Sequence, residues 1–416
     1  MRVYLEVYGC TANKSDLCLI KGELIKNRHE IVSEDEDADA IVILTCTVID
    51  TTEQRMLSRL RFFKNFEKKI IVSGCMASVQ KDLVRTILPN SILLPPEFIY
   101  HINDFLNDKF DNFKTRQKTD FSKTYDEVTA PIMIAEGCML SCSYCITTMA
   151  RGKLRSYPMN GVINDVKSAL DQGCKEIQIT AQDTASYGLD SGHHLGELLE
   201  NICEIQGEFF VRVGMMNPFT AMKNVKSIIQ AYKNPKIYKF LHLPVQSGDN
   251  IILEKMNRKY TVEEFLSIVK NFREKFPEIT ISTDIIAGFP TETDDQFLHS
   301  VELLKKLKPD ITNITRFSAR PNTVAKKLDG RIPTEIVKQR SVMLTDLCKN
   351  ISSKKNKNLI GKKFKVLVTK IREDELHTGR TETYKPVLIK EDVKVGNIVN
   401  TKITDASSTH LYGKLI

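Results

Sequence analysis

The sequence predicts an α/β protein with three parts: an N-terminal open parallel α/β sheet, a central partial (β/α)6 barrel, and a small C-terminal β-barrel of the OB-like kind. Two observations predict this class. Strand-length apolar runs alternate with amphipathic stretches twice along the chain, which is the pattern of βαβ units. Short strands punctuated by glycines then fill the last part of the chain. With 416 residues, the chain has room for two or three domains.

The first alternation covers residues 1–112, which we expect to form an N-terminal domain. Its apolar runs are residues 3–8, 40–44, 70–73 and 91–94. The stretches between the runs suit crossover helices, so the strands are expected to pair in parallel. Residues 113–129 are polar with few large aliphatic side chains and predict a linker.

The second alternation covers residues 130–350 and predicts six β/α units, which fit a partial barrel related to the TIM fold. The expected strands are residues 131–135, 176–180, 209–213, 240–243, 280–286 and 311–317, with helical patterns such as 160–172, 261–275 and 293–307 between them. A Lys/Ser/Asn run at 350–358 then leads into short strands at 364–370, 386–389, 398–403 and 411–415. These strands predict the C-terminal barrel over residues 351–416.

Composition and charge bound the class of protein. Hydrophobic content of 42% and charged content of 27% are ordinary for a soluble chain. No apolar stretch approaches the roughly 20 residues needed to cross a bilayer, so we expect a cytoplasmic protein without a membrane partner. The net charge of +8 is uneven, because residues 351–416 hold 14 Lys plus Arg against 7 Asp plus Glu. This basic module predicts a polyanion partner, with a solvated basic surface as the alternative.

Three of the ten cysteines, Cys138, Cys142 and Cys145, follow the first predicted strand of the central barrel with the spacing C-x3-C-x2-C. Thiolates are the usual ligands of iron–sulfur clusters. Three of them leave one iron of a 4Fe–4S cluster free to bind a small molecule. A zinc site is the alternative, but structural zinc takes four protein ligands and no fourth Cys or His lies nearby.

A second cysteine trio consists of Cys10, Cys46 and Cys75, each at the carboxyl end of a different predicted strand. The carboxyl ends of parallel strands meet at one sheet edge, where ligand sites form. A single buried cysteine is most often a core residue, but three equivalent positions predict a second metal site. The core interpretation holds for the four other cysteines, which are Cys18, Cys174, Cys203 and Cys348.

The central trio resembles the radical S-adenosylmethionine superfamily, in which the free iron holds the amino and carboxylate groups of S-adenosylmethionine. Together the two trios resemble the methylthiotransferase family, and the resemblance covers essentially the whole chain. The segments that carry it are Gly9-Cys10 with Asn13 and Asp16, Thr45-Cys46-Thr47-Val48, Gly74-Cys75-Met76, Cys138 to Cys145, Arg151-Gly152, Thr180 to Thr184, Leu243 to Gly248, Met256 to Arg258, and Asp284 to Thr293. Thr45 departs from the asparagine often found there, which removes no ligand.

The resemblance implies two 4Fe–4S clusters, held by the two trios, and S-adenosylmethionine. No catalytic side chain is expected, because the cofactors carry the radical chemistry. Tyr144, Gln182, Asp183, Arg212 and Gln246 are candidate contacts of S-adenosylmethionine or substrate, although capping or supporting roles fit the last four equally well. His242 is expected to be a core histidine. The C-terminal module resembles the TRAM domain, with candidate phosphate contacts at Lys362, Lys363, Lys365, Lys370, Arg372 and Arg380.

The resemblance also implies a reaction. S-adenosylmethionine would serve once as methyl donor to sulfur and once as radical source, adding a methylthio group to C2 of an adenine at tRNA position 37. Gly9 to Asp16 and Gln182 to Thr184 resemble most the archaeal and eukaryotic branch, which acts on N6-threonylcarbamoyladenosine. The sulfur and electron donors stay unidentified. Alternatives are a methylthiotransferase for isopentenyladenosine in tRNA or for a ribosomal protein aspartate, and an iron–sulfur protein that only binds RNA or senses redox state.

Overall fold

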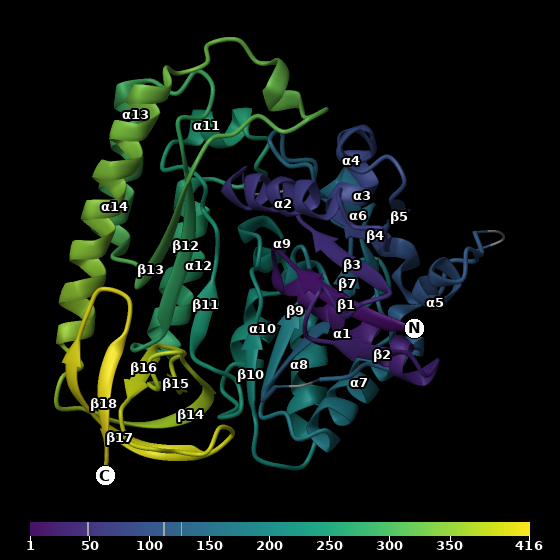
Figure 1. The fold of residues 1–416 in the computed structure, drawn as a ribbon. Helices are drawn as coiled ribbons and strands as arrows, with labels where there is room; N and C mark the ends of the chain where they lie inside the picture. Colours follow the sequence, from purple (N-terminus) through teal and green to yellow (C-terminus); the bar gives the residue numbers. More distant parts are fainter. Residues whose placement is uncertain (48–49, 111–112, 126) are drawn as a thin grey trace.

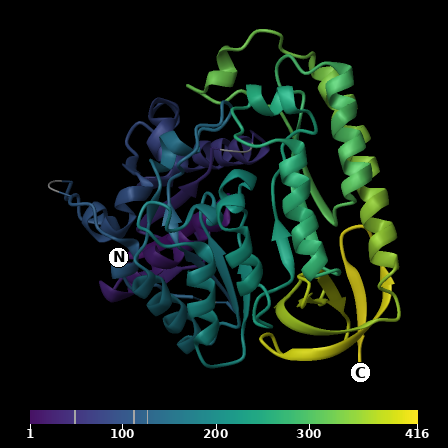
Figure 2. The same ribbon diagram turned by 180° about the vertical axis from the view of Figure 1, so that it is seen from behind.

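The structure is a computed structural model that describes residues 1–47, 50–110, 113–125 and 127–416. Val48 of the family resemblance and the predicted domain boundary at residue 112 lie outside these residues. The ribbon has three parts (Figure 1), and the reverse view shows the same arrangement (Figure 2). An N-terminal sheet lies on one side of a central set of parallel strands, and a yellow C-terminal barrel lies at one end of those strands.

The N-terminal part is a five-stranded parallel sheet in the order β2-β1-β3-β4-β5. Its strands are β1 (Arg2–Val7), β2 (Glu30–Val32), β3 (Ala40–Thr45), β4 (Lys69–Gly74) and β5 (Ile92–Leu94). Its helices are α1 (Thr11–Lys26), α2 (Asp50–Phe63), α3 (Cys75–Val79), α4 (Lys81–Ile87) and α5 (Ile102–Leu106), with a 3-10 turn η1 (Pro96–His101). Every residue of β3 is buried, because apolar cores cover both faces of the sheet. The sequence did not predict β2, a three-residue strand at the edge.

The central part has six parallel strands in two three-stranded sheets, in the orders β10-β9-β6 and β11-β12-β13. The strands are β6 (Thr129–Met133), β9 (Glu176–Thr180), β10 (Phe210–Val213), β11 (Phe240–His242), β12 (Thr280–Ala287) and β13 (Ile311–Arg316). A parallel bridge between Val211 and Ile237 joins the two sheets. This open, partial barrel confirms the predicted fold class, and each expected central strand is present.

Helices surround the central strands, and capping residues in the sequence mark where two of them begin. The helices are α6 (Thr147–Arg151), α7 (Met159–Asp171), α8 (Leu195–Glu204), α9 (Pro218–Lys223), α10 (Val225–Ala231), α11 (Asn250–Lys255), α12 (Val262–Lys275), α13 (Asp294–Leu307) and α14 (Thr334–Lys357). Thr261 and Glu264 form a capping box at the start of α12, and Thr293 and Gln296 form one at the start of α13. A small ribbon pairs β7 (Ala135–Glu136) with β8 (Arg155–Ser156) around the Cys138–Cys145 segment.

The C-terminal part is a closed five-stranded barrel in the order β14-β15-β16-β18-β17. The strands are β14 (Lys363–Ile371), β15 (His377–Thr381), β16 (Pro386–Ile389), β17 (Ile398–Ala406) and β18 (Leu411–Leu415). The small barrel is the one expected, although the polar, glycine-containing β15 was not predicted as a strand. The run at 350–358 is helical up to Lys357, so the break expected at residue 350 falls inside α14. Ser352 and Asn356 explain this, because both are buried against neighbouring elements.

The turn between β15 and β16 fixes the C-terminal barrel to the amino ends of the central strands. Lys385 pairs with Asp310, just before β13, at 2.8 Å. The Tyr384 hydroxyl donates to Glu176, the first residue of β9, at 3.2 Å. The backbone N–H of Lys239, just before β11, donates to the carbonyl of Glu382. The cysteine loop lies at the opposite, carboxyl end of these strands, so the C-terminal barrel does not cover it.

The segment expected as a linker is packed into the molecule. It contains a 3-10 turn, η2 (Lys118–Asp120), and two buried lysines. Lys123 pairs with Asp165 of α7 at 2.7 Å, and the N–H of Thr124 donates to the carbonyl of Cys18. Its polar residues are therefore held by ion pairs and backbone bonds. Across the described parts of the chain, no helix has the length and apolar character needed to span a membrane.

Candidate functional site

The central trio lies in the loop between β7 and α6, at the carboxyl end of β6. The hydrogen bonds that hold this loop include Gly137 N–H to Gln182 Oε1 at 2.7 Å, Cys138 N–H to the Gly152 carbonyl at 3.2 Å, and Ser143 N–H to the Met256 carbonyl at 3.0 Å. Gly137 has φ +79°, and a Cβ there would lie 2.1 Å from the Lys153 carbonyl oxygen. Only glycine fits this turn, which directs the cysteine loop toward the carboxyl ends of the central strands.

Each thiol of this trio accepts one N–H hydrogen bond. The backbone N–H of Leu140 donates to Cys138 Sγ and that of Thr147 to Cys145 Sγ, both at 3.4 Å. The third donor is a side chain, since Arg258 Nη1 lies 3.2 Å from Cys142 Sγ. Such donors stabilise thiolate charge and tune iron–sulfur clusters. Burial raises the pKa of Cys138 to about 12, and the neighbouring thiols of Cys145 and Cys142 add to the rise.

Arg258 is a site residue whose role the sequence did not reveal. Its guanidinium lies partly buried between the cysteine loop and the loop after β11, donating also to the Tyr260 hydroxyl at 3.0 Å and the Tyr144 hydroxyl at 3.5 Å. Burial acts to lower the pKa of Arg258, but the hydroxyls and the Cys142 thiol outweigh it and raise it well above the ordinary value. One signal in the sequence could have pointed to it. Arg258 ends a segment, Met256 to Arg258, that carries the family resemblance, although it lies 116 residues from Cys142.

The five predicted cofactor contacts fall into two groups. Gln182 and Tyr144 adjoin the cysteine loop, since Gln182 binds Gly137 and the Tyr144 ring packs with Ile252, Met256 and Phe289 in one apolar cluster. Gln246 follows β11 with φ +76°, a conformation that costs a non-glycine residue about 1–3 kcal/mol and is often found at functional sites. Its backbone pairs with β12.

Asp183 and Arg212 have other surroundings. The Asp183 carboxylate is 1% exposed and accepts from Asn217 N–H, Ala185 N–H and the Thr220 hydroxyl. Burial raises its pKa to about 6 despite these donors. Arg212 lies over the rings of Phe240 and Tyr384, at 5.4 and 5.8 Å, toward the C-terminal barrel. The structure therefore does not bring Arg212 to the cysteine loop. The Asp183 carboxylate ties the end of β9 to the start of α9, and its charge lies close enough to Cys138 to help raise the pKa of that thiol. His242 is half-buried, bonded to Asp284 at 3.0 Å.

The N-terminal trio gathers at the carboxyl ends of β1, β3 and β4. Cys10 precedes α1, Cys46 follows β3, and Cys75 begins α3. Gly9 (φ +96°) and Gly74 (φ +82°) make this possible. A Cβ on Gly9 would lie 2.6 Å from Cys46 Cβ, and one on Gly74 would lie 2.2 Å from the Thr45 carbonyl oxygen. Both glycines therefore allow approaches that no other residue permits.

The electrostatics of this trio involve a residue from the central part. Burial raises the pKa of the Cys75 thiol, Arg151 opposes the rise, and the neighbouring Cys10 thiol adds to it. Cys10 also lies at the amino end of the 16-residue helix α1, where the helix dipole favours negative charge. Among the described residues, no three His, Cys, Asp or Glu side chains have the spacing for a single metal ion. A 4Fe–4S cluster is wider than one ion, and neighbouring thiols beside the cationic Arg151 fit it.

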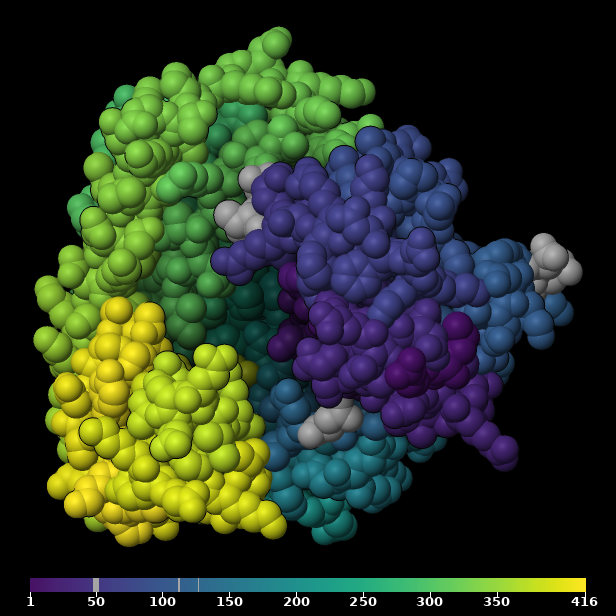
Figure 3. All heavy atoms as spheres, viewed as in Figure 1, coloured from purple at the N-terminus to yellow at the C-terminus, as the bar shows by residue number. Residues whose placement is uncertain are grey.

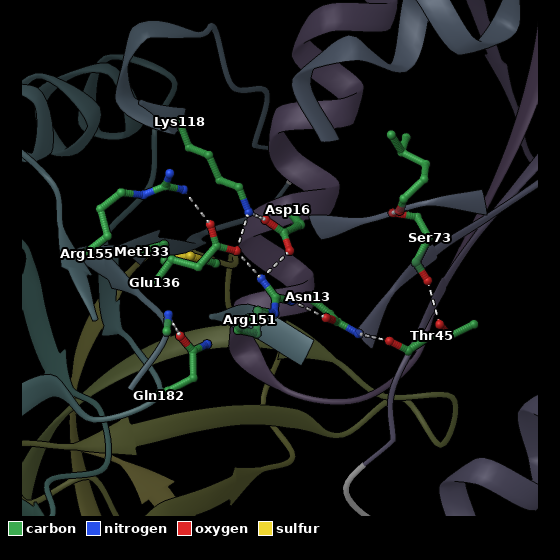
Figure 4. A network of polar contacts seen from close by, with 12 residues as sticks. Asn13, Asp16, Thr45, Ser73, Lys118, Met133, Glu136, Arg151, Arg155 and Gln182 are labelled. Carbon is green, nitrogen blue, oxygen red and sulfur yellow. Dashed lines mark hydrogen bonds and ion pairs between the residues drawn. The ribbon is translucent and has the colours of Figure 1, made fainter. Parts of the chain in front are cut away.

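Arg151, just after the central trio, connects the two cysteine sites (Figure 4). Its Nη2 donates to Asn13 Oδ1 at 2.7 Å, and its Nη1 lies 2.8 Å from Asp16 and 2.9 Å from Glu136. Asn13 in turn donates to the carbonyls of Tyr8 and Thr45, beside the N-terminal cysteines. The chain of contacts thus runs from the central loop to the edge of the N-terminal sheet.

Lys118 completes this buried cluster. Its Nζ lies 2.8 Å from Asp16 Oδ1 and 2.8 Å from Glu136 Oε1, and its side chain is 2% exposed. Burial acts to raise the pKa of Glu136, but Lys118 and Arg151 outweigh it and hold this pKa below its ordinary value. Two carboxylates and two cations therefore balance one another between the N-terminal sheet and the central barrel.

The predicted phosphate contacts of the C-terminal barrel are not equivalent. Lys362 pairs with Glu278 at 2.8 Å, Arg372 pairs with Asp374 at 3.1 Å, and Arg380 lies 4.7 Å over the Tyr384 ring. Lys363, Lys365 and Lys370 are exposed on β14.

Two further exposed lysines were missed by the sequence interpretation. Lys402 on β17 lies directly opposite Lys363, and Lys414 on β18 lies directly opposite Lys402. Across the described residues, none of Lys363, Lys402 and Lys414 has an ion-pair partner. Like charges at opposed positions are unfavourable by themselves, and a polyanion removes that cost.

Comparison with known proteins adds the family. The model described as the radical SAM superfamily matches residues 132–304, that of uncharacterized protein family UPF0004 matches residues 2–94, and that of the TRAM domain matches residues 357–416. A protein of Archaeoglobus fulgidus named "Probable threonylcarbamoyladenosine tRNA methylthiotransferase" is 42% identical over 426 residues, covering 100% of this chain and 99% of that protein. The chain belongs to this methylthiotransferase family. It is therefore a radical SAM enzyme, and the non-enzyme alternative is excluded.

Two relatives of this methylthiotransferase at lower identity bear on its substrate. A Drosophila melanogaster "Threonylcarbamoyladenosine tRNA methylthiotransferase" is 32% identical, covering 100% of this chain and 78% of its own. A "tRNA-2-methylthio-N(6)-dimethylallyladenosine synthase" of Thermodesulfovibrio yellowstonii is 34% identical, covering 100% and 98%. Among solved structures, the radical S-adenosylmethionine methyltransferase TsrM of Kitasatospora setae has a TM-score of 0.56 at 12% identity, covering 78% of this chain and 76% of its own. That likeness supports the fold alone. The family uses S-adenosylmethionine and 4Fe–4S chemistry.

Proposed function

We propose that this enzyme converts N6-threonylcarbamoyladenosine at position 37 of tRNA to its 2-methylthio derivative. The names of its archaeal and insect relatives support the nucleoside. The observation that carries the proposal is the contact of Arg151 with Asn13, which links the two cysteine trios through one side chain. Adding a methylthio group joins C–H activation to sulfur delivery, and this needs two neighbouring centres.

The proposal assigns one 4Fe–4S cluster to Cys138, Cys142 and Cys145 and a second to Cys10, Cys46 and Cys75. When bound, S-adenosylmethionine would supply the methyl group and the carbon radical, and the clusters would pass on an electron and carry sulfur, both from donors that are unassigned. The protein holds the thiolates, with Arg258 donating to Cys142 and Arg151 placed beside Cys75. Of the predicted cofactor contacts, Tyr144, Gln182 and Gln246 remain candidates for S-adenosylmethionine. Asp183 is proposed to hold the end of β9 against the start of α9, and Arg212 to support the C-terminal barrel.

The surface offers a place for RNA. In Figure 3 a hollow lies between the purple N-terminal part and the yellow C-terminal barrel, with the teal central part as its floor. The proposal assigns residues 1–112 to a cluster-binding domain, 113–129 to a connection, 130–350 to the radical SAM domain and 351–416 to an RNA-binding TRAM domain. The opposed lysines of the C-terminal barrel would hold phosphates, which position the tRNA without reading its sequence. A cytoplasmic location follows from the tRNA substrate, and the electron and sulfur donors are unassigned.

Two measurements test the proposal. Anaerobic reconstitution is expected to yield about eight irons per chain, the content of two 4Fe–4S clusters. Cys10→Ala should lose the N-terminal set and methylthiolation while keeping reductive cleavage of S-adenosylmethionine, whereas Cys142→Ala should lose that cleavage. Cys348→Ser, in the core, is the matched control and should keep both. Four irons in the wild-type chain would contradict the second cluster.

Mass spectrometry of tRNA nucleosides from a deletion strain tests the substrate. The 2-methylthio derivative of threonylcarbamoyladenosine should disappear and return on complementation. Its persistence would disprove the nucleoside assignment. Loss of the isopentenyladenosine derivative instead would favour the activity named for the Thermodesulfovibrio relative. Loss of the methylthio group from a ribosomal protein aspartate, seen by mass spectrometry of that protein, would favour the ribosomal-protein alternative.

A further inference from the structure

Arg320 provides a second link between the two halves of the active site. It lies in the loop after the carboxyl end of β13, and the Arg320 carbonyl accepts from the Thr323 hydroxyl at 2.8 Å. The N–H of Ala325, in the same loop, donates to the carbonyl of Ser143, between Cys142 and Cys145, at 2.8 Å. This loop therefore rests directly on the segment that carries the central cysteines.

The Arg320 side chain points toward the N-terminal domain. Its Nη1 lies 2.6 Å from Oε2 of Glu53 on α2. The other oxygen of Glu53 accepts from Gln80 Nε2 at 2.9 Å, and Gln80 Oε1 accepts from the Thr47 hydroxyl at 2.6 Å. Thr47 directly follows Cys46. The Arg320 guanidinium is thus tied to both cysteine-bearing regions, as Arg151 is, by an independent set of contacts.

One end of this guanidinium has no partner. The side chain of Arg320 is 7% exposed, and within the described residues its buried Nη2 has no hydrogen-bond acceptor. Leaving a buried donor unpaired costs about 1–3 kcal/mol. Two other buried arginines differ in this respect. Arg151 places both terminal nitrogens on acceptors, and Arg340 does so with Glu292 and Asp294. Arg320 therefore carries a fixed, desolvated donor that suits a ligand acceptor.

We infer that Nη2 of Arg320 binds the carboxylate of the threonylcarbamoyl group, so that Arg320 is a specificity-determining residue. This inference rests on the proposed function. In that nucleoside the threonine nitrogen is acylated and its carboxylate is free, whereas a dimethylallyl group has neither charge nor acceptor. A guanidinium held at one nitrogen by Glu53 presents its other nitrogen in a geometry that matches a carboxylate oxygen. A site built to bond a substrate group rejects analogues lacking it, because its buried donor is then left unpaired.

The test compares two substrates on the reconstituted holoenzyme: tRNA carrying threonylcarbamoyladenosine, and the same tRNA with that carboxylate converted to its methyl ester. Wild type should lose roughly 10- to 100-fold in kcat/KM on esterification, the value of a hydrogen bond to a charged group. Arg320→Gln should lose a similar factor on the native substrate and show no further loss on the ester. Arg331→Gln, on the exposed side of the same connection, should behave as wild type.

The outcomes separate this inference from the proposed function. Equal esterification penalties in wild type and Arg320→Gln would overturn the role of Arg320, and so would a wild-type enzyme that ignores the ester. Iron content and tRNA-independent cleavage of S-adenosylmethionine report whether Arg320→Gln is folded. If it is not, Arg320→Lys, which keeps the positive charge, is compared with wild type on the same two substrates, and an esterification penalty equal to that of wild type overturns the role of the Arg320 guanidinium. If wild type forms no 2-methylthio product on the native substrate, the proposed function fails first.

Discussion

Arg151 Nη2 donates a 2.7 Å hydrogen bond to Asn13 Oδ1 across 138 residues of sequence. Both side chains are buried, and each lies a few residues from one cysteine trio. Asn13 uses its amide nitrogen to bind the Tyr8 and Thr45 carbonyls, so its oxygen must face the arginine. A movement of either loop would break this bond. The distance between the two cysteine sites is therefore fixed by buried contacts of the folded protein.

Arg151→Met should destabilise the protein strongly. It would leave Asp16 and Glu136 buried with only Lys118 between them, and breaking a buried ion pair costs about 3–5 kcal/mol. Arg155→Met is the matched control, since Arg155 contacts Glu136 at 3.2 Å from a side chain 32% exposed and should cost less than about 1 kcal/mol. Urea unfolding of the cluster-free chain measures both, and equal losses would contradict the central role of Arg151.

Gly74→Ala should remove the N-terminal metal site selectively. Its φ of +82° disfavours alanine, and the new Cβ would lie 2.2 Å from the Thr45 carbonyl oxygen, next to Cys46 and Cys75. Iron per chain should fall from about eight to about four, while S-adenosylmethionine cleavage continues. Gly207→Ala has φ +114° but open space around its Cβ, so it should keep full iron. An unchanged iron content in Gly74→Ala would count against the site.

Arg258→Gln should shift the reduction potential of the central cluster downward. A cationic donor on Cys142 stabilises the more negative, reduced state, so its loss makes reduction harder by on the order of tens of millivolts. Redox titration followed by electron paramagnetic resonance measures this on the variant. Arg258→Lys keeps the charge and should recover part of the shift. A potential identical to wild type would show that Arg258 only supports the fold.

Lys363, Lys402 and Lys414 should each contribute to the salt dependence of tRNA binding. Replacing any one by Gln is expected to reduce the slope of log affinity against log salt by about 0.7–0.9, the effect of losing one phosphate contact. Lys362→Gln is the control, because Glu278 already neutralises that lysine, and its slope should stay near wild type. Fluorescence anisotropy over a salt series gives the slopes, and four equal slopes would refute the assignment.

Asp165 should make stability decrease as pH rises through the weakly acidic range. Burial raises its pKa to about 6 despite the Lys123 pair, above its ordinary value of 3.8. The folded state thus holds this proton more tightly than the unfolded state, and stability is lost between about pH 4 and 6, by about 3 kcal/mol relative to Asp165→Asn. Urea unfolding of both proteins across this range measures the difference. A difference that does not change with pH would contradict the raised pKa.

Much of the fold is visible in the sequence because its signals are local. The apolar runs of β3, β4, β9 and β12 predict their own strands, and glycine beside cysteine marks where strands end. The errors also have local causes. β15 is polar and contains Gly379, so it reads as a turn. Residues 350–357 contain a single aliphatic side chain, Ile351, yet Ser352 and Asn356 bond to buried partners and keep α14 helical.

The two cysteine trios, the order of the three parts and the family resemblance can be read from the sequence, because each depends on residue types within and beside local strand patterns. What surrounds the trios depends on the tertiary fold. Lys118 and Lys123 look like solvent-exposed linker residues until carboxylates from α1, β7 and α7 enclose them. Arg151 and Arg258 fall in segments of the family resemblance, but nothing local to them or to Arg320 in the sequence indicates what they contact. Their partners lie 138, 116 and 267 residues away, and the chain's path, not its local pattern, brings those groups together.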